Sequence, residues 1–172
     1  AVSYHGLPYD IDGVMNVARK HNLIVIEDNA QTQLAKYKGR MVGKDAQFSL
    51  FSFERTKHVS SGEGGILVTN DEKLAVEARK YAGLGFINLK AGKSKMVAIT
   101  PVDFQRPDYV RHDRLGVNYR FTEFCAAVVL AQFERIEEIV NLRQEIGKIY
   151  DSVFEGTKFE PQTVPEGYTH SY

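Results

Sequence analysis

Residues 48–71 read FSLFSFERTKHVSSGEGGILVTND, and this stretch decides the fold. Two short apolar runs, at residues 47–53 and 65–70, flank a turn that is rich in serine and glycine. Aromatic and β-branched residues are typical of strands, and clusters of Gly and Ser mark the turns between them. The pattern predicts two strands, the first of which ends near Lys57.

An alternation of helix and strand precedes this stretch. Residues 10–22, DIDGVMNVARKHN, carry apolar residues at helical spacing after Asp10 or Asp12 as a cap. Residues 23–28, LIVIED, form an unbroken apolar run that predicts a strand buried on both faces. A helix that leads into such a strand indicates the α/β class. Because the chain opens with the helix, we expect the strand before it to lie outside these residues.

Three further segments follow residue 70. Residues 71–84 predict a helix with Asp71 near its cap, and residues 85–115 show no sustained period, as in a functional loop or lid. Residues 122–154 predict one long helix that begins at Thr122. Its apolar stripe is expected to form core or a subunit interface. The stripe comprises Ala126, Ala127, Leu130, Phe133, Ile136, Ile139 and Val140.

Composition limits the function classes. The chain has 172 residues with 22 basic and 22 acidic side chains, so its formal net charge is zero. No global basic field favours nucleic acid or an anionic membrane surface. The single cysteine, Cys125, excludes an internal disulfide, fits a reducing compartment and is expected to be a buried structural thiol. With no transmembrane run, signal-peptide pattern or metal-ligand spacing of histidines, we expect a cytoplasmic protein without a metal site.

Lys57 is the first candidate for chemistry. An amine at the end of a strand can project into the crevice where open α/β sheets bind ligands. In a partly apolar pocket, a lysine has a lowered pKa and can form a Schiff base with an aldehyde. Ser52, Thr56 and the SSGEGG turn offer hydroxyl and backbone N–H groups suited to phosphate. The alternative is a surface lysine on a plain hairpin turn.

Asp28 is the second candidate. At the carboxyl end of a strand, its carboxylate can pair with a protonated ring nitrogen, which pyridoxal phosphate needs to act as an electron sink. Alternatively, Asp28 caps a following helix. Glu27 could be the buried partner of a basic residue, and Gln31 could contact a cofactor hydroxyl or act as a cap. Asp28 and Lys57 at successive strand ends suit pyridoxal phosphate, whereas no Gly-x-Gly-x-x-Gly follows a strand to favour a nicotinamide cofactor.

Two long motifs carry a family resemblance. Residues 25–71, VIEDNAQTQLAKYKGRMVGKDAQFSLFSFERTKHVSSGEGGILVTND, resemble the central signature of the DegT/DnrJ/EryC1/StrS sugar aminotransferases. Residues 114–146, RLGVNYRFTEFCAAVVLAQFERIEEIVNLRQEI, are similar to the next block of that family. The resemblance implies fold type I, the aspartate-aminotransferase-like fold with a mainly parallel, mixed sheet and flanking helices. It places part of the large domain in residues 1–150 and the start of the small C-terminal domain in residues 151–172.

The resemblance also implies roles for five residues. Lys57 takes the place of the lysine that binds pyridoxal phosphate as a Schiff base and moves the proton during transamination. Asp28 takes the place of the partner of the ring nitrogen, and Gln31 lies where the family contacts the 3-hydroxyl of the cofactor. Ser52 matches a phosphate-binding serine. Asn118 in GVNYR matches an asparagine that reaches the phosphate of the neighbouring subunit, which implies a homodimer with shared active sites.

The reaction implied by the resemblance is transfer of an amino group, from an amino-acid donor such as glutamate, to a keto-sugar. The usual acceptor in the family is a nucleotide-linked keto-sugar, in amino-sugar and polysaccharide biosynthesis. Members that act as dehydratases carry His at the position of Lys57, so that branch is disfavoured. Asn29 stands where alanine is usual, and the family's upstream phosphate loop and ring-stacking aromatic are outside these residues. The alternative is a non-catalytic piece that serves a structural or subunit-interface role.

A few other residues have two interpretations each. His58 is either a substrate contact or an exposed histidine on the turn. The basic run in the 85–115 loop either binds the diphosphate of a nucleotide-linked sugar or is simply solvated. Tyr119 and Arg120 are expected to shape the subunit interface. The basic run comprises Arg106, Arg111 and Arg114.

Overall fold

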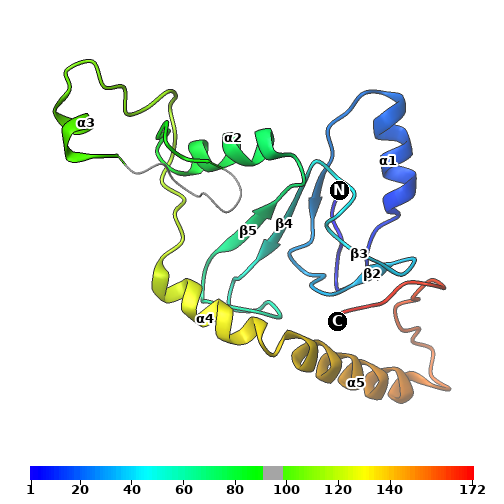
Figure 1. Ribbon diagram of the computed structural model, residues 1–172. Coiled ribbons are helices and arrows are strands. Elements are labelled where there is room, and N and C mark those ends of the chain that lie inside the picture. The colour runs from blue at the N-terminus through cyan, green and yellow to red at the C-terminus, as the bar shows by residue number, and fades with distance from the viewer. Residues whose placement is uncertain (91–98) are drawn as a thin grey trace. The chain divides into compact units, whose positions relative to one another are not determined.

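The structure is a computed structural model that describes residues 1–90 and 99–172 (Figure 1). The chain forms two compact units, one from residues 1–68 with 123–172 and the other from residues 69–122. None of the helices in the described part of the chain has both the length and the apolar character needed to span a bilayer. The elements are α1 (Ile11–Lys20), β1 (Ile26–Asp28), β2 (Lys36–Tyr37), β3 (Arg40–Met41), β4 (Phe48–Ser52), β5 (Gly65–Val68), α2 (Glu72–Ala82), α3 (Pro101–Gln105), α4 (Glu123–Phe133) and α5 (Ile136–Phe154).

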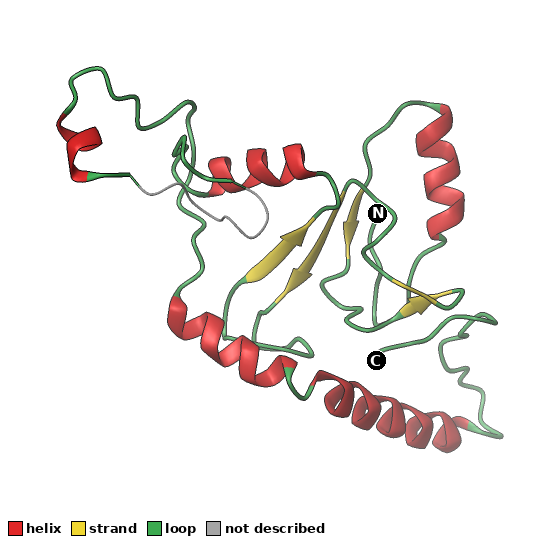
Figure 2. Cartoon of the chain, viewed as in Figure 1, coloured by secondary structure: helices red, strands yellow, loops and turns green. Residues whose placement is uncertain are grey.

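Three strands of the first unit form a mixed sheet in the order β1–β4–β5 (Figure 2). β1 runs parallel to β4, and β5 returns antiparallel to β4. The three predicted strands and the mixed α/β sheet are therefore confirmed. A separate antiparallel pair, β2 and β3, was not predicted.

The residues before α1 extend this sheet. Val2 forms a parallel bridge with Asp28. The Asp28 N–H donates to the Ala1 carbonyl at 2.8 Å, and the Ser3 N–H donates to the Asp28 carbonyl at 2.9 Å. Residues 1–3 thus pair alongside β1 as an isolated bridge and not as a strand, so the expectation that the strand before α1 lies outside these residues stays a prediction.

β1 is shorter and more exposed than the LIVIED run predicts. Only Ile26–Asp28 are in the strand, and Leu23 and Ile24 are 56% and 72% exposed. Val25 and Glu27, by contrast, are buried. The prediction of a strand buried on both faces is wrong here, because the described residues cover only the face that Val25 and Glu27 share.

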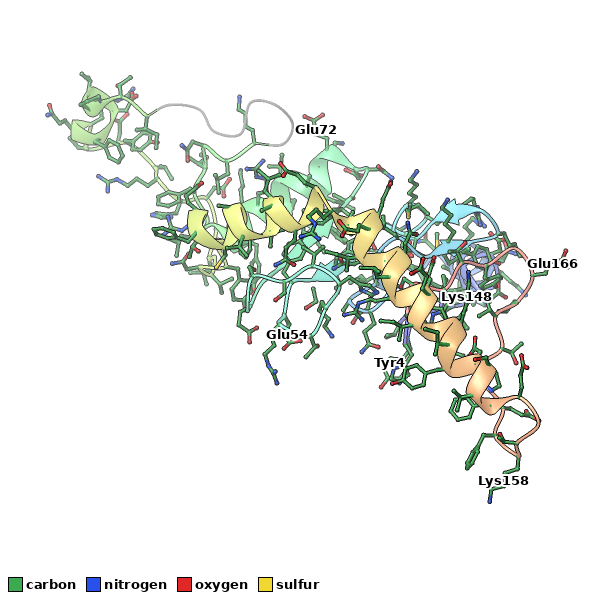
Figure 3. The ribbon with its side chains drawn as sticks, turned by 90° about the horizontal axis from the view of Figure 1, so that it is seen from below. Tyr4, Glu54, Glu72, Lys148, Lys158 and Glu166 are labelled. Atoms are coloured by element: carbon green, nitrogen blue, oxygen red, sulfur yellow. The ribbon has the colours of Figure 1, made fainter. Side chains whose placement is uncertain are left out.

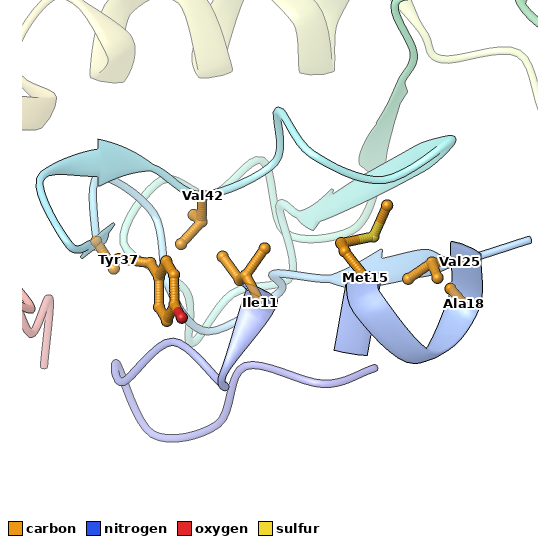
Figure 4. Packing of buried hydrophobic residues seen from close by; sticks show 7 residues of the cluster. Ile11, Met15, Ala18, Val25, Tyr37 and Val42 are labelled. Carbon is orange, nitrogen blue, oxygen red and sulfur yellow. The ribbon is translucent and has the colours of Figure 1, made fainter. Parts of the chain in front are cut away.

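The main core of the first unit lies between α1 and the buried face of β1. Asp10 caps α1 by accepting the Gly13 N–H at 3.1 Å, which confirms this helix and one of its two predicted caps. The buried Tyr37 hydroxyl donates to the same Asp10 carboxylate at 2.6 Å. Figure 4 shows Ile11 beside Tyr37 and Val42, so α1 is anchored at its first turn. The buried cluster comprises Ile11, Met15, Ala18, Val25, Ala35, Tyr37 and Val42.

The predicted long helix is in fact two helices, α4 and α5, which follow one another in Figure 3. At the break, the Arg135 N–H donates to the Gln132 carbonyl at 3.0 Å, in a tighter turn than the α-helical ladder. Gln132 is held by Ser60, since its Nε2 donates to the Ser60 carbonyl at 2.7 Å and its Oε1 accepts the Ser60 N–H at 2.9 Å. This two-point contact fixes the last turn of α4 beside the turn that follows β4.

The predicted apolar stripe is only partly buried. Val129 of α4 packs with Phe53 in a second small core, and Ile136 of α5 packs against it. Leu130 was predicted on the same stripe but is 64% exposed. Cys125 is half-buried rather than buried. The role of the stripe as core is therefore confirmed at Val140, which is 3% exposed, and at Ile136, but not at Leu130.

The second unit begins with α2. Asp71 caps this helix by accepting the N–H groups of Lys73 and Leu74 at 2.8 and 3.1 Å, as predicted. The stretch predicted to be irregular contains the short helix α3, because Thr100 and Asp103 form a reciprocal capping box at its start. Residues 91–98 of that stretch lie outside the described part of the chain. The role of this loop as a lid stays a prediction.

Replacing Asp71 with alanine is expected to loosen the first turn of α2, because two backbone N–H groups lose their shared acceptor. Loss of an N-cap costs about 1 kcal/mol, so amide exchange at Lys73 and Leu74 should accelerate about fivefold. Hydrogen exchange of the intact protein measures this. Asp71→Ser keeps a capping oxygen and should exchange close to the wild-type rate. Equal protection of both amides in Asp71→Ala and the wild type would contradict the role of the cap.

Candidate active site

The sheet register places Asp28 and Ser52 on one face. Asp28 lies opposite Leu50 of β4. Because side chains alternate between the two faces of a strand, Ser52 points to the same side as Leu50 and Asp28. A carboxylate and a hydroxyl thus share one face at the carboxyl ends of two parallel strands, where open α/β sheets bind ligands.

A local turn holds the Asp28 carboxylate. Its Oδ1 accepts the Ala30 N–H at 3.0 Å, and the residue is half-buried. The alternative that Asp28 caps a helix is wrong, because residues 29–35 form turns and the next element is the strand β2. The remaining acceptor capacity of the carboxylate is available to a ligand on this face.

Ser52 starts the turn that leads to Lys57. Its Oγ accepts the Glu54 N–H at 3.1 Å, and its carbonyl accepts Nε2 of Gln33 at 3.0 Å. A hydroxyl has one proton to donate in addition to its two lone pairs. Ser52 is therefore fixed in place and retains a donor that suits an anion such as phosphate.

Lys57 and Gln31 line one cavity of about 450 Å³ in the first unit. Lys57 is half-buried, and its backbone N–H donates to the Glu54 carbonyl at 3.0 Å. Oε1 of Gln31 accepts the His5 N–H at 2.9 Å, so the amide NH2 of Gln31 is left to donate. Asp28 and Ser52 do not line this cavity. The four candidates therefore form two pairs, Lys57 with Gln31 at the cavity and Asp28 with Ser52 on the sheet face.

The cavity is rich in basic groups. In addition to Lys57 it is lined by Arg143 and three histidines, and no carboxylate of the described residues lines it. Nη1 of Arg143 donates to the Tyr172 carbonyl at 3.4 Å, which draws α5 and the C-terminal segment to the same wall. The positive charges of Lys57 and Arg143 favour anionic ligands such as carboxylates and phosphates. The three histidines are His5, His58 and His170.

His58 is buried, and its predicted place as an exposed turn residue is wrong. It is 6% exposed, with Nε2 at 3.2 Å from the Ser171 carbonyl. Nδ1 has no hydrogen-bond partner among the described residues. Burial lowers the pKa of the imidazole, and the nearby Arg143 charge acts in the same direction. His58 is therefore neutral at pH 7, with the proton on Nε2 donated to Ser171.

The lowered pKa of His58 makes stability depend on pH. Its folded pKa lies below the ordinary value of 6.5, so the unfolded state binds the extra proton as pH falls. Stability is therefore full above about pH 6.5 and declines as pH drops toward the folded pKa. His170 contributes with the same sign, because burial also lowers its pKa.

We expect His58→Gln to flatten the dependence of Tm on pH in this acidic window. A matched His170→Gln variant should flatten it in part, and the double variant should flatten it further. NMR titration of the His58 ring, assigned through the His58→Gln spectrum, should give a midpoint below 6.5. A midpoint above that value would contradict the neutral buried imidazole.

Asn118 belongs to the second unit. Its backbone forms a bridge with Gly83, and its side-chain Oδ1 accepts Nε of Arg120 at 2.9 Å. This hydrogen bond orients the amide so that its NH2 group is left to donate to an outside acceptor. Asn118 is exposed, which suits a residue that acts on a second molecule.

The basic run of the same unit is partly neutralised. Arg106 and Arg114 each pair with carboxylates of their own unit. Arg111 instead lies over the Phe104 ring, with 4.6 Å between the guanidinium carbon and the ring centroid. These ion pairs weaken the diphosphate-binding interpretation for Arg106 and Arg114.

Comparison with known proteins decides the family. The model described as the DegT/DnrJ/EryC1/StrS aminotransferase family matches residues 1–172. The chain belongs to this family. The resemblance carried by the two motifs is therefore confirmed.

Relatives in the DegT/DnrJ/EryC1/StrS family include two GDP-perosamine synthases. The protein of Escherichia coli O157:H7 is 36% identical over 149 residues, which are 87% of this chain and 36% of that protein. The protein of Vibrio cholerae is 31% identical over 172 residues, which are 100% of this chain and 42% of that protein. The chain thus spans less than half the length of these relatives.

Solved structures of the family confirm the fold class. An aminotransferase from Psychrobacter cryohalolentis superposes with a TM-score of 0.83 at 30% identity, covering 99% of this chain and 44% of that chain. DesV of S. venezuelae, solved in complex with a ketimine intermediate, gives 0.80 at 28% identity, covering 99% and 41%. PseC of Helicobacter pylori, an aminotransferase involved in the biosynthesis of pseudoaminic acid, gives 0.76 at 25% identity, covering 92% and 38%.

The structure of this family member adds residues that sequence reasoning missed. Arg143 and His170 reach the Lys57 cavity from α5 and the C-terminal segment, and no local motif marks either of them. The expectation that Glu27 pairs with a basic residue is wrong. Glu27 is fully buried and accepts the backbone N–H groups of Gly43 and Ala46 instead.

Proposed function

We propose that the intact protein is a pyridoxal-phosphate-dependent aminotransferase that moves an amino group from an amino-acid donor, such as glutamate, to a keto-sugar. The observation that carries the proposal is the cavity that Lys57 and Gln31 line, which is rich in basic groups and free of described carboxylates. Family membership and the similarity to GDP-perosamine synthases support a nucleotide-linked sugar as the acceptor.

The residues present fit the cofactor. Lys57 supplies an amine at a cavity that suits anions, and Gln31 presents an amide NH2 to the same cavity. On the sheet face, Asp28 offers a carboxylate for a ring nitrogen, and Ser52 offers a hydroxyl proton for a phosphate. Asn118 offers an amide NH2 for the phosphate in a partner subunit. When bound, the cofactor supplies an electron sink for the carbon that loses its proton.

Each side chain then has a task, and Lys57 has two. Lys57 holds the cofactor and, once its Nζ is released, takes the proton from the α-carbon of the donor as a general base. Asp28 keeps the proton on the ring nitrogen, and Gln31 orients the ring through the 3-hydroxyl. The Arg143 guanidinium attracts the carboxylate of the donor. In the second half of the reaction, Lys57 returns a proton as the amino group passes to the keto-sugar.

The assembly and setting follow from the same proposal. We place residues 1–150 in the cofactor-binding large domain and residues 151–172 at the start of the small C-terminal domain. The exposed Asn118 suits a homodimer in which each subunit completes the active site of the other. A cytoplasmic location, in amino-sugar and polysaccharide biosynthesis, accords with an acceptor that is a nucleotide-linked sugar.

Reduction with borohydride tests this proposal. The purified intact protein is mixed with pyridoxal phosphate, its absorbance spectrum is recorded, and the sample is reduced and mapped by peptide mass spectrometry. We expect a new absorbance band, which reduction removes, and a cofactor-sized mass increase on the peptide that contains Lys57. Lys44, which lies in the same part of the chain, is the internal control and should stay unmodified. No covalent link at Lys57 would overturn the proposal.

A further inference from the structure

The end of β1 carries a buried polar network on the face opposite to Asp28. Glu27 and Asn29 are both fully buried, and strand alternation directs them away from the side of Asp28. Nδ2 of Asn29 donates to Oγ of Ser49 at 2.7 Å and to Oε2 of Glu27 at 3.3 Å. Oδ1 of Asn29 accepts the Thr32 hydroxyl at 3.1 Å. Both amide hydrogens and the amide oxygen of Asn29 are thus used.

Glu27 ties this network to the turn before β4. Its Oε1 accepts the Ala46 N–H at 3.2 Å, and its Oε2 accepts the Gly43 N–H at 3.3 Å. Because no basic side chain of the described residues pairs with Glu27, these N–H groups and the Asn29 amide satisfy the buried carboxylate. A buried polar network is stable only when its members are bonded, so this one strongly favours a single arrangement.

The main chain on both sides of Asp28 is held by the network. Glu27 precedes it, and the Asn29 N–H that follows donates to the Leu50 carbonyl of β4 at 2.9 Å. Among the described residues, the Asp28 carboxylate accepts one hydrogen bond, from the Ala30 N–H. The direction of the Asp28 carboxylate is therefore set by its buried neighbours more than by contacts of its own.

We propose that Asn29 is a positioning residue that fixes the Asp28 carboxylate against the ring nitrogen of pyridoxal phosphate. The inference rests on the proposed function and adds a residue to it. Asn29 acts through the backbone that it shares with Asp28 and does not touch the cofactor. Alanine at this position makes none of these side-chain bonds, so the Ser49 and Thr32 hydroxyls lose this partner and Glu27 keeps only its two backbone N–H donors.

The first test is Asn29→Ala in the intact protein. We expect the Kd for pyridoxal phosphate to rise about tenfold, as the loss of a buried polar partner implies. The kcat should fall by a similar factor, while KM for the amino-acid donor stays unchanged. The pH midpoint of the absorbance change of the bound cofactor should also rise. A ring nitrogen without its positive charge would no longer oppose protonation of Lys57 Nζ in its link to the cofactor.

A double-mutant cycle separates positioning from general destabilisation. In an Asp28→Asn background, Asn29→Ala should change kcat and the absorbance midpoint little further, because the carboxylate that it positions is gone. Tyr37→Phe is the matched control, since it removes a partly buried hydrogen bond to Asp10, and neither residue belongs to the Asn29 network. It should lower Tm while leaving the Kd for the cofactor unchanged. Equal effects of Asn29→Ala in both backgrounds would overturn the inference.

A second variant covers the case in which Asn29→Ala does not fold. Ser49→Ala removes only the 2.7 Å hydrogen bond and should shift the same absorbance midpoint in the same direction by a smaller amount. If the cofactor is linked to Lys57 in the wild type and Ser49→Ala has the wild-type absorbance midpoint, this inference alone is overturned. A wild-type protein without that link would overturn the proposed function and, with it, this role of Asn29.

Discussion

Replacing Lys57 with alanine is expected to abolish transamination, because one amine has two tasks in the proposed reaction. The loss of the general base alone lowers kcat by about 10²- to 10⁴-fold. The loss of the covalent link adds to that effect and leaves the cofactor removable by dialysis. Steady-state kinetics and the absorbance of the dialysed protein measure the two losses separately.

The Lys57→Ala variant has an internal check. A small primary amine added to the solution should restore part of the proton transfer, because it can enter the cavity that Lys57 and Gln31 line. Arg55→Ala is the matched control, since this neighbouring basic side chain on the same turn is 82% exposed. It should keep wild-type kcat. Full turnover by Lys57→Ala would remove Lys57 from the mechanism.

Replacing Asp28 with asparagine is expected to lower kcat while the cofactor stays linked to Lys57. An adjacent carboxylate raises the pKa of a protonated ring nitrogen by about 1–3 units, and its loss corresponds to about 10- to 1,000-fold in rate. The amide is nearly isosteric and can still accept the Ala30 N–H. Kinetics combined with borohydride mapping should therefore show slow turnover and an intact covalent link.

Asp108→Asn is the control for Asp28→Asn. Asp108 pairs with Arg106 on the surface of the second unit, and its side chain is 71% exposed. This variant should retain wild-type kcat, since exposed ion pairs contribute little to stability. An Asp28→Asn enzyme as fast as this control would show that Asp28 does not hold the ring proton.

The strands and their order along the chain could be predicted from local sequence. The runs at residues 47–53 and 65–70 are short, aromatic or β-branched and bounded by turn residues, and each forms a strand. The caps at Asp10 and Asp71 could be predicted for the same reason, because an N-cap depends on residues only two or three positions away. Lys57 and Gln31 line one cavity, which Asp28 and Ser52 do not line, so the joint role of the four residues stays a prediction.

What could not be predicted depends on contacts between distant residues. The break between α4 and α5 is accompanied by the contact of Gln132 with Ser60, which is 72 residues away in sequence. The burial of His58 depends on Ser171, which is 113 residues away. Periodicity within a helix carries no information on such partners. The composition of a turn likewise does not say which distant segment covers it.

The burial of β1 failed as a prediction for a related reason. An unbroken apolar run indicates two covered faces, but the described residues cover only the face of Val25 and Glu27. Glu27 was expected to need a cation, since buried charges are usually paired. Backbone N–H groups of the following turn satisfy it instead, and the identity of those residues gives no sign of this.

The walls of the Lys57 cavity have a consequence for the order of events during synthesis. His5 and Gly6 come from the start of the described chain, and His170 and Tyr172 come from its end. The Ser171 N–H donates to the Gly6 carbonyl at 2.9 Å, which closes the wall between them. This cavity can therefore close only after residue 172 has left the ribosome. A ligand that binds in this cavity therefore cannot guide the folding of the segments that are made before residue 170.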